Sequence, residues 1–178
     1  MQRSNAPLSL FSFEKITEKS LPFLLTWFKE PHVQKWWPIP TQDEVYAHFL
    51  KRIRSKDTFG YLVIADGTPI GYIQYYYLDM SETKTGAHLP VTLPESTVGT
   101  DQFIGDPSYL GKGYGTAFIK AFIPYLRTIE PHITTVIVDP DPTNVAAIRC
   151  YEKVGFKRVT EYQTPYGPAL LMRYDIER

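Results

Sequence analysis

The chain has 178 residues and a mass of 20.5 kDa, a size that fits one domain with its own core and is too short for two ordinary domains. Hydrophobic residues make up 43% of the sequence, charged residues 21% and aromatic residues 15%, which excludes a disordered chain and a coiled coil. The 19 basic residues balance the 19 acidic ones, so the chain lacks the basic excess of proteins that work by neutralising nucleic-acid phosphates.

Cysteine usage and hydrophobicity indicate a soluble protein of a reducing compartment. Cys150 is the only cysteine, so an intrachain disulfide framework is excluded and a cytoplasmic location is expected. No apolar run approaches the roughly 18 residues of a membrane span. The segment Met1–Phe13 lacks the continuous apolar stretch of a signal peptide. We therefore expect one domain over residues 1–178, acting without a membrane or nucleic-acid partner.

A strand and two helices are predicted in the first third of the chain. Apolar residues favour a strand over residues 10–16. Ser20 is predicted to be the N-cap of a first helix that Pro31 ends. The sequence Thr41-Gln42-Asp43-Glu44 has the form of a capping box and predicts a second helix.

The middle of the chain predicts a hairpin followed by a long loop. Residues 59–65 and 70–77 resemble two strands joined at Asp66-Gly67, a pair that favours a hairpin turn. Residues 78–100 have no periodicity and contain two prolines, so we expect a loop with a functional or mobile role. A short strand is expected at 101–105.

The last third predicts two more helices around a buried strand, and then a terminal pair of strands. Pro124 is expected to kink or shorten the first of these helices. The order of strands and helices predicts an α/β fold with a mixed sheet. The expected elements are a helix over 113–127, a buried strand over 133–138, a helix that Thr143 or Asn144 opens and Gly155 ends, and two strands around 165–167.

A glycine-rich loop, Leu110-Gly111-Lys112-Gly113-Tyr114-Gly115-Thr116, precedes the helix at 113–127. Glycines at alternate positions let the backbone approach a ligand and direct several N–H groups into one concavity. The helix N-terminus and Lys112 add positive charge, so the expected ligand is a phosphate or a pyrophosphate. The spacing excludes a Walker A loop and the dinucleotide-binding fingerprint. The alternative is a flexible turn that merely starts the helix.

A second pattern places Asn144, Ala147 and Tyr151 on one face of the following helix, because they are spaced i, i+3, i+7. The small Ala147 between an amide and a phenol leaves a groove in which a thin chain can lie. The alternative is an ordinary amphipathic helix whose tyrosine belongs to the core.

Taken together, the glycine loop, the buried strand and the Asn-x-x-Ala-x-x-x-Tyr pattern ending in Gly155-Phe156 resemble the GNAT superfamily of acetyl-CoA-dependent N-acetyltransferases. The resemblance covers most of the chain. It implies a single GNAT domain with a mixed, mostly antiparallel sheet of about six to seven strands flanked by helices, acetyl-CoA as cosubstrate and no metal. The implied cofactor contacts are Gly111, Lys112, Gly113, Gly115 and Thr116 at the pyrophosphate, Phe103 and Ile104 along the pantetheine, and Asn144, Ala147 and Tyr151 at the pantetheine and thiol.

Further motifs are similar to those of the aminoglycoside 6′-N-acetyltransferases. They are Pro69-Ile70-Gly71-Tyr72, Asp101-Gln102, Gly167-Pro168-Ala169 and the Trp36-Trp37 pair. The implied function is antibiotic resistance by direct transfer of the acetyl group to the 6′-amine of a cationic aminoglycoside, by a monomer or homodimer. Two alternatives stay open: an acyltransferase for another amine, such as a siderophore hydroxylysine precursor or a polyamine, and a non-catalytic acyl-CoA-binding module.

Two residues are candidates for the acid–base chemistry. The resemblance implies that Asp101 is the base and amine anchor, and the alternative is an aspartate that only caps the end of its strand. Tyr151 is suited to protonate the leaving thiolate because a phenol keeps its proton at neutral pH, and the alternative is an aromatic ring that only packs against the pantetheine. A backbone N–H near Phe103 is expected to polarise the acetyl carbonyl. Cys150 adjoins Tyr151 but points about 100° away from the groove, so it is interpreted as buried filler. The implied substrate contacts are Trp37, Gln74, Tyr76, Asp101 and Asp139.

Overall fold

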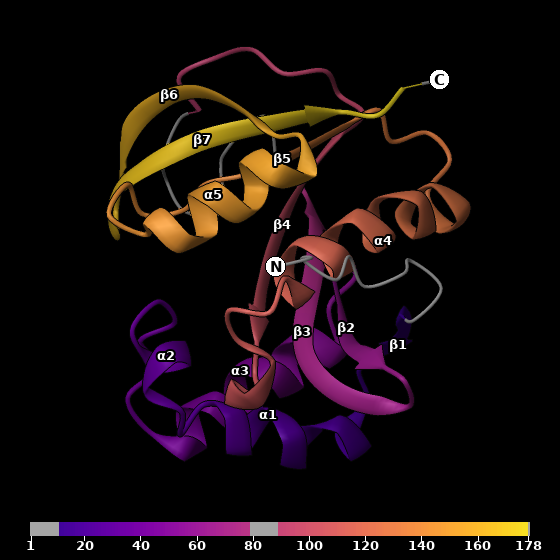
Figure 1. The fold of residues 1–178 in the computed structure, drawn as a ribbon, viewed down its shortest axis with the longest axis vertical. Helices are drawn as coiled ribbons and strands as arrows, with labels where there is room; N and C mark the ends of the chain where they lie inside the picture. Colours follow the sequence, from indigo (N-terminus) through magenta and orange to yellow (C-terminus); the bar gives the residue numbers. More distant parts are fainter. Residues whose placement is uncertain (1–10, 79–88, 178) are drawn as a thin grey trace, which may run out of the picture. The chain divides into compact units, whose positions relative to one another are not determined.

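The structure, a computed structural model, describes residues 11–78 and 89–177 (Figure 1). Seven strands follow one another across a sheet in the order β1-β2-β3-β4-β5-β7-β6, with β4 and β5 parallel and the pairs β1–β2, β5–β7 and β6–β7 antiparallel. This confirms the expected α/β fold with a mixed, mostly antiparallel sheet. The elements are β1 (Phe11–Lys15), η2 (Glu18–Ser20), α1 (Leu21–Trp27), α2 (Pro31–Gln34), α3 (Gln42–Ile53), β2 (Thr58–Ala65), β3 (Thr68–Tyr77), β4 (Thr97–Ile104), η3 (Pro107–Tyr109), α4 (Tyr114–Ile129), β5 (Thr135–Val138), α5 (Val145–Val154), β6 (Lys157–Thr164) and β7 (Gly167–Asp175).

The chain divides into two compact units. Of the described residues, the first comprises 11–75 together with 101–121, and the second comprises 76–78, 89–100 and 122–177. The N-terminal helices, β1, β2 and most of β3 belong to the first unit. The second unit holds β5, β6, β7 and α5. Each unit has its own cluster of buried apolar side chains.

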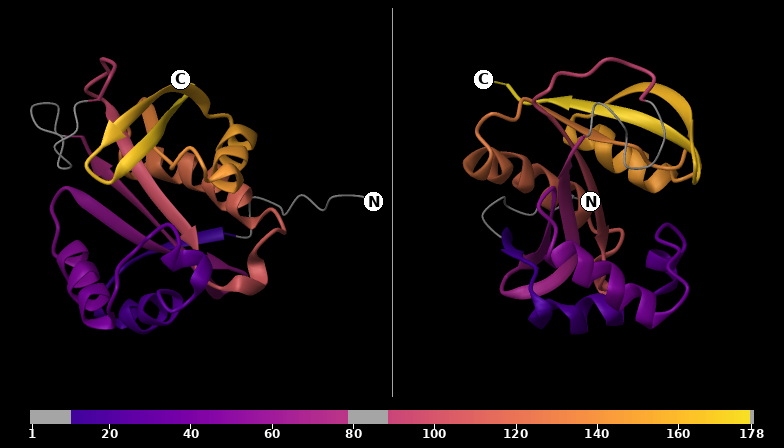
Figure 2. Two further views of the ribbon diagram at one scale, coloured as in Figure 1. Left: turned by 90° about the vertical axis from the view of Figure 1, so that its left-hand side faces the viewer. Right: turned by 180° about the vertical axis from the view of Figure 1, so that it is seen from behind.

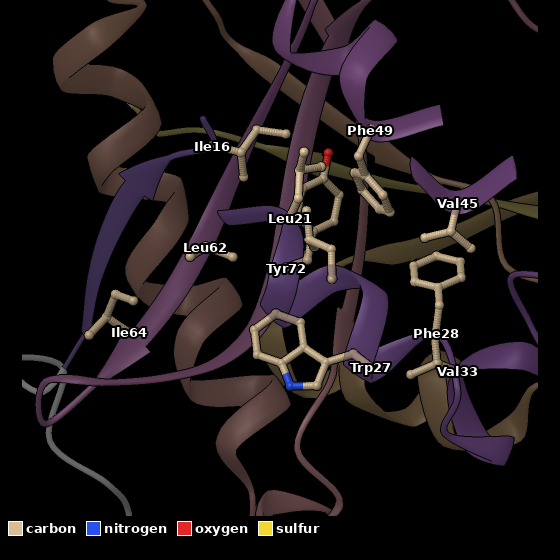
Figure 3. Close-up of a cluster of buried hydrophobic side chains, with 11 residues drawn as sticks. Ile16, Leu21, Trp27, Phe28, Val33, Val45, Phe49, Leu62, Ile64 and Tyr72 are labelled. Atoms are coloured by element: carbon tan, nitrogen blue, oxygen red, sulfur yellow. The ribbon is translucent and has the colours of Figure 1, made fainter. Parts of the chain in front are cut away.

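An aromatic core holds the first unit together (Figure 3). Phe28, Phe49 and Tyr72 are fully buried, and their rings meet edge to face, with centroids 5.4 Å apart for Phe28–Phe49 and 5.2 Å for Phe49–Tyr72. Such ring pairs contribute about 0.5–1.5 kcal/mol each beyond the area they bury. The core joins α1 and α3 to β2 and β3, and the indigo and purple helices stay grouped beside these strands in all three views (Figure 2).

Local sequence signals fix the ends of α3 and of the first hairpin as predicted. The Thr41 hydroxyl accepts the Glu44 N–H at 3.3 Å, and the Glu44 carboxylate accepts the Thr41 N–H at 3.0 Å, which completes the capping box. At the turn between β2 and β3, Asp66 has a φ of 48° and Gly67 a φ of 77°. Two successive left-handed residues are what a type I′ hairpin turn requires.

The first helix differs from its prediction. Ser20 precedes α1 as expected, but its hydroxyl accepts the Thr17 N–H at 3.1 Å and does not cap the helix. The helix ends at Trp27, and Pro31 begins α2 instead of ending α1. The physical reason is that proline has no N–H to lose and a preset φ, so it fits the first turn of a helix.

Two further boundaries were predicted wrongly. β4 begins at Thr97, four residues before the expected start at 101, and Thr97–Gly99 pair with Thr135–Ile137 of β5. Pro124 does not shorten α4, which continues to Ile129, beyond the expected end at 127, while the alternative that it kinks the helix stays a prediction. Five apolar residues on α4 are buried: Phe118, Ile119, Phe122, Ile123 and Leu126.

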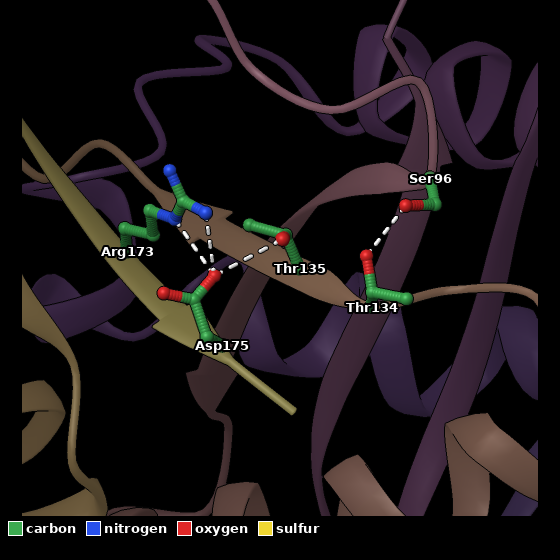
Figure 4. Close-up of polar contacts among 5 residues, drawn as sticks. All are labelled: Ser96, Thr134, Thr135, Arg173 and Asp175. Atoms are coloured by element: carbon green, nitrogen blue, oxygen red, sulfur yellow. Dashed lines mark hydrogen bonds and ion pairs between the residues drawn. The ribbon is translucent and has the colours of Figure 1, made fainter. Parts of the chain in front are cut away.

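The second unit is built around β5, whose four residues are all buried, as predicted. Polar contacts join its strands at one end (Figure 4). The Thr135 hydroxyl donates to the Asp175 carboxylate at 3.1 Å, and Arg173 forms an ion pair with the same carboxylate at 2.8 Å. Helix α5 begins after Asn144 and ends at Gly155, whose φ is 123°, and it lies beside β7 in Figures 1 and 2.

Candidate active site

Asp101 on β4 is the half-buried end of a row of three hydrogen-bonded side chains in the first unit. Gln74 on β3 donates its Nε2–H to Asp101 Oδ2 at 2.7 Å. The Tyr72 hydroxyl donates to Gln74 Oε1 at 2.9 Å. Tyr72 and Gln74 are two residues apart on one strand, so their side chains leave the same face of the sheet.

The surroundings of Asp101 alter its acid–base behaviour. Burial raises the pKa of its carboxyl above the usual range, while the hydrogen bond from Gln74 and the positive charge of Arg52 act in the opposite direction. A carboxylate with a raised pKa is a stronger base. Burial, assisted by the charge of Asp101, also raises the pKa of the Tyr72 phenol, which therefore stays protonated and serves as a donor.

Helix α3 brings two more titratable side chains into the same unit. Arg52 donates to the Thr58 hydroxyl at 3.4 Å. His48 lies one turn before it, and burial together with the charges of Arg52 and Lys51 lowers the pKa of His48 to about 4. His48 Nε2 and Arg52 Nε are buried without a recorded hydrogen-bond partner among the described residues. His48 is thus a neutral imidazole at pH 7.

A glycine makes room for the Tyr72 hydroxyl. A Cβ atom at Gly60 of β2 would lie 2.3 Å from that hydroxyl oxygen, far inside contact distance. Tyr72 has no exposed surface and packs against Phe49 and Phe103, so its ring has no space into which to retreat. The absence of a side chain at Gly60 therefore allows the row of hydrogen bonds from Tyr72 through Gln74 to Asp101.

Trp37, predicted as a substrate contact, is half-buried in the aromatic cluster of the first unit. Its ring meets those of Phe28, Tyr72 and Phe103 edge to face, with centroids 5.2–6.2 Å apart. This packing fixes the indole in one orientation. Direct contact of Trp37 with a substrate stays a prediction.

The C-terminal end of β4 holds Phe103 and Ile104, the two residues expected along the pantetheine. A Cβ atom at Gly71 would lie 2.4 Å from the Phe103 carbonyl oxygen, so the backbones of β3 and β4 approach closely there. The Ile104 carbonyl oxygen lies 2.9 Å from His32 Nε2 of α2. One of the two lone pairs of that oxygen is thereby occupied within the protein.

The glycine loop has the backbone shape of an anion cradle. Gly111 has a φ of 70° and Gly113 a φ of 86°, and a Cβ at either position would meet nothing within 4 Å. Glycine is therefore required there for the left-handed backbone and not for space. Helix α4 starts directly afterwards, and the N–H groups of a first helical turn lack intrahelical acceptors. With the exposed Lys112 between the two glycines, the loop fits a pyrophosphate.

Asn144 acts as the N-cap of α5 in the second unit. Its Oδ1 accepts the Ala147 N–H at 3.2 Å, so the amide oxygen is partly used by the helix itself. Tyr151 is 8% exposed, and its ring lies 5.7 Å from that of Phe156. Cys150 is half-buried, not fully buried as predicted. The roles of Asn144, Ala147 and Tyr151 toward a cofactor stay predictions.

The other two predicted substrate residues of the second unit also have partners. Asp139 follows β5, and its Oδ2 accepts the Tyr162 hydroxyl at 3.0 Å. The Tyr76 ring lies over Gly99, where a Cβ atom would be 2.3 Å from its Cζ. Sequence reasoning missed Tyr162, Arg52 and Gly60, because each acts through a contact with a residue distant along the chain.

Neither a metal site nor a membrane span emerges from the residues that the structure describes. Within 11–78 and 89–177 no three His, Cys, Asp or Glu side chains gather in a way that suits a metal ion. No helix in these ranges is long and apolar enough to cross a membrane.

Comparison with known proteins gives the same family by sequence and by structure. Residues 17–164 match the family described as "Acetyltransferase (GNAT) domain". The "Aminoglycoside N(6')-acetyltransferase type 1" of Klebsiella pneumoniae is 34% identical over 169 residues, which cover 88% of this chain and 79% of that protein. The aminoglycoside acetyltransferase AAC(6')-Ib with coenzyme A and kanamycin superposes with a TM-score of 0.81 at 32% identity, covering 93% of this chain and 94% of that one. AAC(6')-Ib with ribostamycin and coenzyme A gives a TM-score of 0.82 at 33% identity, covering 93% of both chains.

Proposed function

The chain belongs to the GNAT acetyltransferase family, and we propose that it transfers the acetyl group of acetyl-CoA to the 6′-amino group of an aminoglycoside. The observation that carries the proposal is the Asp101 carboxylate, which is half-buried, has a raised pKa and is connected through Gln74 to Tyr72 of the aromatic cluster. The relatives described as aminoglycoside 6′-N-acetyltransferases, and their structures with kanamycin and ribostamycin, support this choice of acceptor.

Acetyl-CoA supplies the activated acetyl group as a thioester, and side chains of the protein accept and donate the protons. Asp101 takes the proton of the acceptor ammonium, so that the amine nitrogen attacks the acetyl carbonyl carbon with its lone pair. The C–S bond breaks as the C–N bond forms, and Tyr151 donates its phenolic proton to the departing sulfur. The nitrogen then loses its second proton, which passes through water to the tyrosinate and restores the phenol. A backbone N–H at Phe103 stabilises the negative charge that develops on the carbonyl oxygen.

We assign the remaining predicted residues to binding. Positive charge and backbone N–H groups at the glycine loop hold the pyrophosphate of acetyl-CoA. The negative charges of Asp101 and Asp139 attract the cationic acceptor. The cofactor contacts are Gly111, Lys112, Gly113, Gly115, Thr116, Phe103, Ile104, Asn144 and Ala147, and the acceptor contacts are Trp37, Tyr76, Asp101 and Asp139.

The wider context of the protein is proposed on the same basis. We propose that residues 1–178 act as one GNAT domain, as a monomer or homodimer in the cytoplasm, where acetyl-CoA is available. Size-exclusion chromatography with light scattering distinguishes the two assemblies.

The experiment that tests the proposal measures CoA thiol release by the purified protein with a panel of acceptors. The panel holds kanamycin, ribostamycin, spermidine and N-hydroxylysine, and NMR of the product locates the acetyl group. We expect turnover with the aminoglycosides and acetylation at the 6′ nitrogen. Turnover restricted to spermidine or N-hydroxylysine would replace the acceptor but keep the chemistry. Binding of acetyl-CoA without turnover on any acceptor would make the chain a non-catalytic module.

A further inference from the structure

The two hydrogen bonds between Tyr72, Gln74 and Asp101 have only one consistent direction. An ionised carboxylate only accepts, so the Gln74 atom 2.7 Å from Asp101 Oδ2 must be its NH₂ group. The other end of the amide is then a carbonyl oxygen, which also only accepts, so the Tyr72 hydroxyl must donate to it across 2.9 Å. The charge of Asp101 thus determines the orientation of both neighbours.

Burial makes this arrangement rigid. Gln74 is 2% exposed and Tyr72 is 0% exposed, so water does not compete for either hydrogen bond. Gly60 leaves space for the Tyr72 hydroxyl, and the surrounding rings hold the phenol in place. A buried amide between two fixed partners has no alternative position, since an unpaired amide group in the core is costly.

From this geometry we propose that Gln74 is a positioning residue for Asp101: the amide, held by Tyr72, fixes the carboxylate through Oδ2 and leaves Oδ1 to take the acceptor proton. The inference rests on the proposed function, in which Asp101 is the base. It changes the role expected for Gln74, which acts through Asp101 and not by contact with the acceptor.

The charges around Asp101 and its burial determine in which direction its pKa changes when the Gln74 donor is removed. The groups that act on Asp101 are the Gln74 amide of β3 and the Arg52 guanidinium of α3, both of which favour the ionised carboxylate, and burial, which disfavours it. The Tyr72 phenol of β3 is neutral in the physiological range, because burial raises its pKa. Removing the Gln74 donor leaves burial opposed by Arg52 alone. The pKa of Asp101 should then rise further.

The variant that tests this is Gln74→Met, which keeps the length of the side chain and removes the donor. We expect the acidic limb of the pH profile of kcat/KM for the acceptor to move to higher pH by roughly one to two units. A shift of this size corresponds to the loss of one hydrogen bond to a charged group. Below the limb, kcat/KM for the acceptor falls roughly tenfold for each unit. The KM for acetyl-CoA should not change.

Two further variants make the test specific. Tyr72→Phe keeps the ring and removes only the donor to Gln74, so it should move the limb in the same direction by a smaller amount. It also carries the test if Gln74→Met does not fold. Thr135→Val removes a buried hydroxyl of the second unit and should leave the limb in place, since Thr135 bonds Asp175 and not the base.

A readout that needs no turnover completes the design. Carboxyl ¹³C NMR of Asp101 should give a higher pKa in Gln74→Met and Tyr72→Phe than in the parent protein. An unchanged Asp101 pKa and an unmoved limb in both variants, with Asp101→Asn inactive, would overturn the positioning role alone. Full activity of Asp101→Asn would instead overturn the base assignment and, with it, the inference that depends on it.

Discussion

At the scale of single residues, burial sets the protonation states in the first unit. The Asp101 carboxyl, the Tyr72 phenol and the His48 imidazole are all partly or fully removed from water, and for each of them burial is the main cause of its shifted pKa. Burial favours the neutral form of every such group. Asp101 remains usable as a base because Gln74 and Arg52 favour its ionised form.

His48 should make the protein less stable in acid. Its pKa is about 4 in the folded protein and 6.5 in the unfolded chain, so between these values the unfolded chain binds a proton that the native protein does not. Stability from this group is therefore complete above pH 6.5 and is lost as the pH falls toward 4. His48→Phe removes the titrating imidazole. As the pH is lowered from 8 to 5, the urea midpoint of the parent should therefore fall relative to that of the variant. A difference independent of pH would contradict this assignment.

Tyr151 and Cys150 are neighbours on α5 that allow a matched comparison. Tyr151→Phe keeps the packing against Phe156 and removes the phenolic proton, so kcat should fall by about 10²–10⁴-fold, the usual effect of a lost general acid, while acetyl-CoA binding is retained. Cys150→Ala should leave kcat unchanged. Loss of activity in Cys150→Ala, together with parallel lines in double-reciprocal plots, would indicate an acyl-enzyme and contradict direct transfer.

At the scale of elements, two short segments contain residues in the left-handed backbone conformation, and only one of them suits a bound anion. The loop before α4 contains left-handed residues at Gly111 and Gly113, and the turn between β2 and β3 contains them at Asp66 and Gly67. The two segments have similar backbone strain for any residue with a Cβ atom. Only the loop before α4 lies at the start of a long helix, where N–H groups point outward.

The glycine loop can thus be tested against the hairpin turn. Gly113→Ala places a Cβ atom on a backbone with a φ of 86°, which costs about 1–2 kcal/mol and favours a changed loop shape. Calorimetry should show weaker CoA binding. Gly67→Ala, at a φ of 77° and with equally open surroundings, should lower stability by a similar amount and leave CoA affinity unchanged. Equal CoA affinity in both folded variants would refute the loop assignment.

At the scale of the whole molecule, charge is balanced, so long-range attraction of a cationic acceptor has no source in net charge. Attraction must come from local acids, for which Asp101 and Asp139 are the candidates. Such attraction weakens with ionic strength because salt screens exposed charges beyond about 8–10 Å. The net charge of the protein therefore does not attract a polycation, and only these local acids do.

We accordingly expect the KM for the acceptor to rise with salt, and the KM for acetyl-CoA to change less. Initial rates with kanamycin from low to physiological ionic strength give both constants. Asp139→Asn should reduce the dependence of the acceptor KM on salt, because it removes one of the two charges. An acceptor KM that is independent of salt would point to a neutral acceptor.

Features of the fold and of the candidate site could be predicted from the sequence where the interacting residues lie close together in the chain, and not where they lie far apart. The capping box at Thr41, the turn at Asp66-Gly67 and the end of α5 at Gly155 are local, and the structure confirms all three. The start of β4 was missed because Thr97 and Gly99 carry no apolar alternation and become a strand only by pairing with β5. The Gln74–Asp101 hydrogen bond spans 27 positions and has no sequence signature.

The close approach of Gly60 to Tyr72 has a consequence for how the gene can change. Any single-base change that replaces a glycine codon with another amino acid introduces at least a Cβ atom, and at position 60 that atom would meet the tyrosine hydroxyl at 2.3 Å. The displaced hydroxyl would release the Gln74 amide, and with it the carboxylate at Asp101. Under aminoglycoside selection we therefore expect position 60 to remain glycine in a saturation library, although glycine bears no functional group.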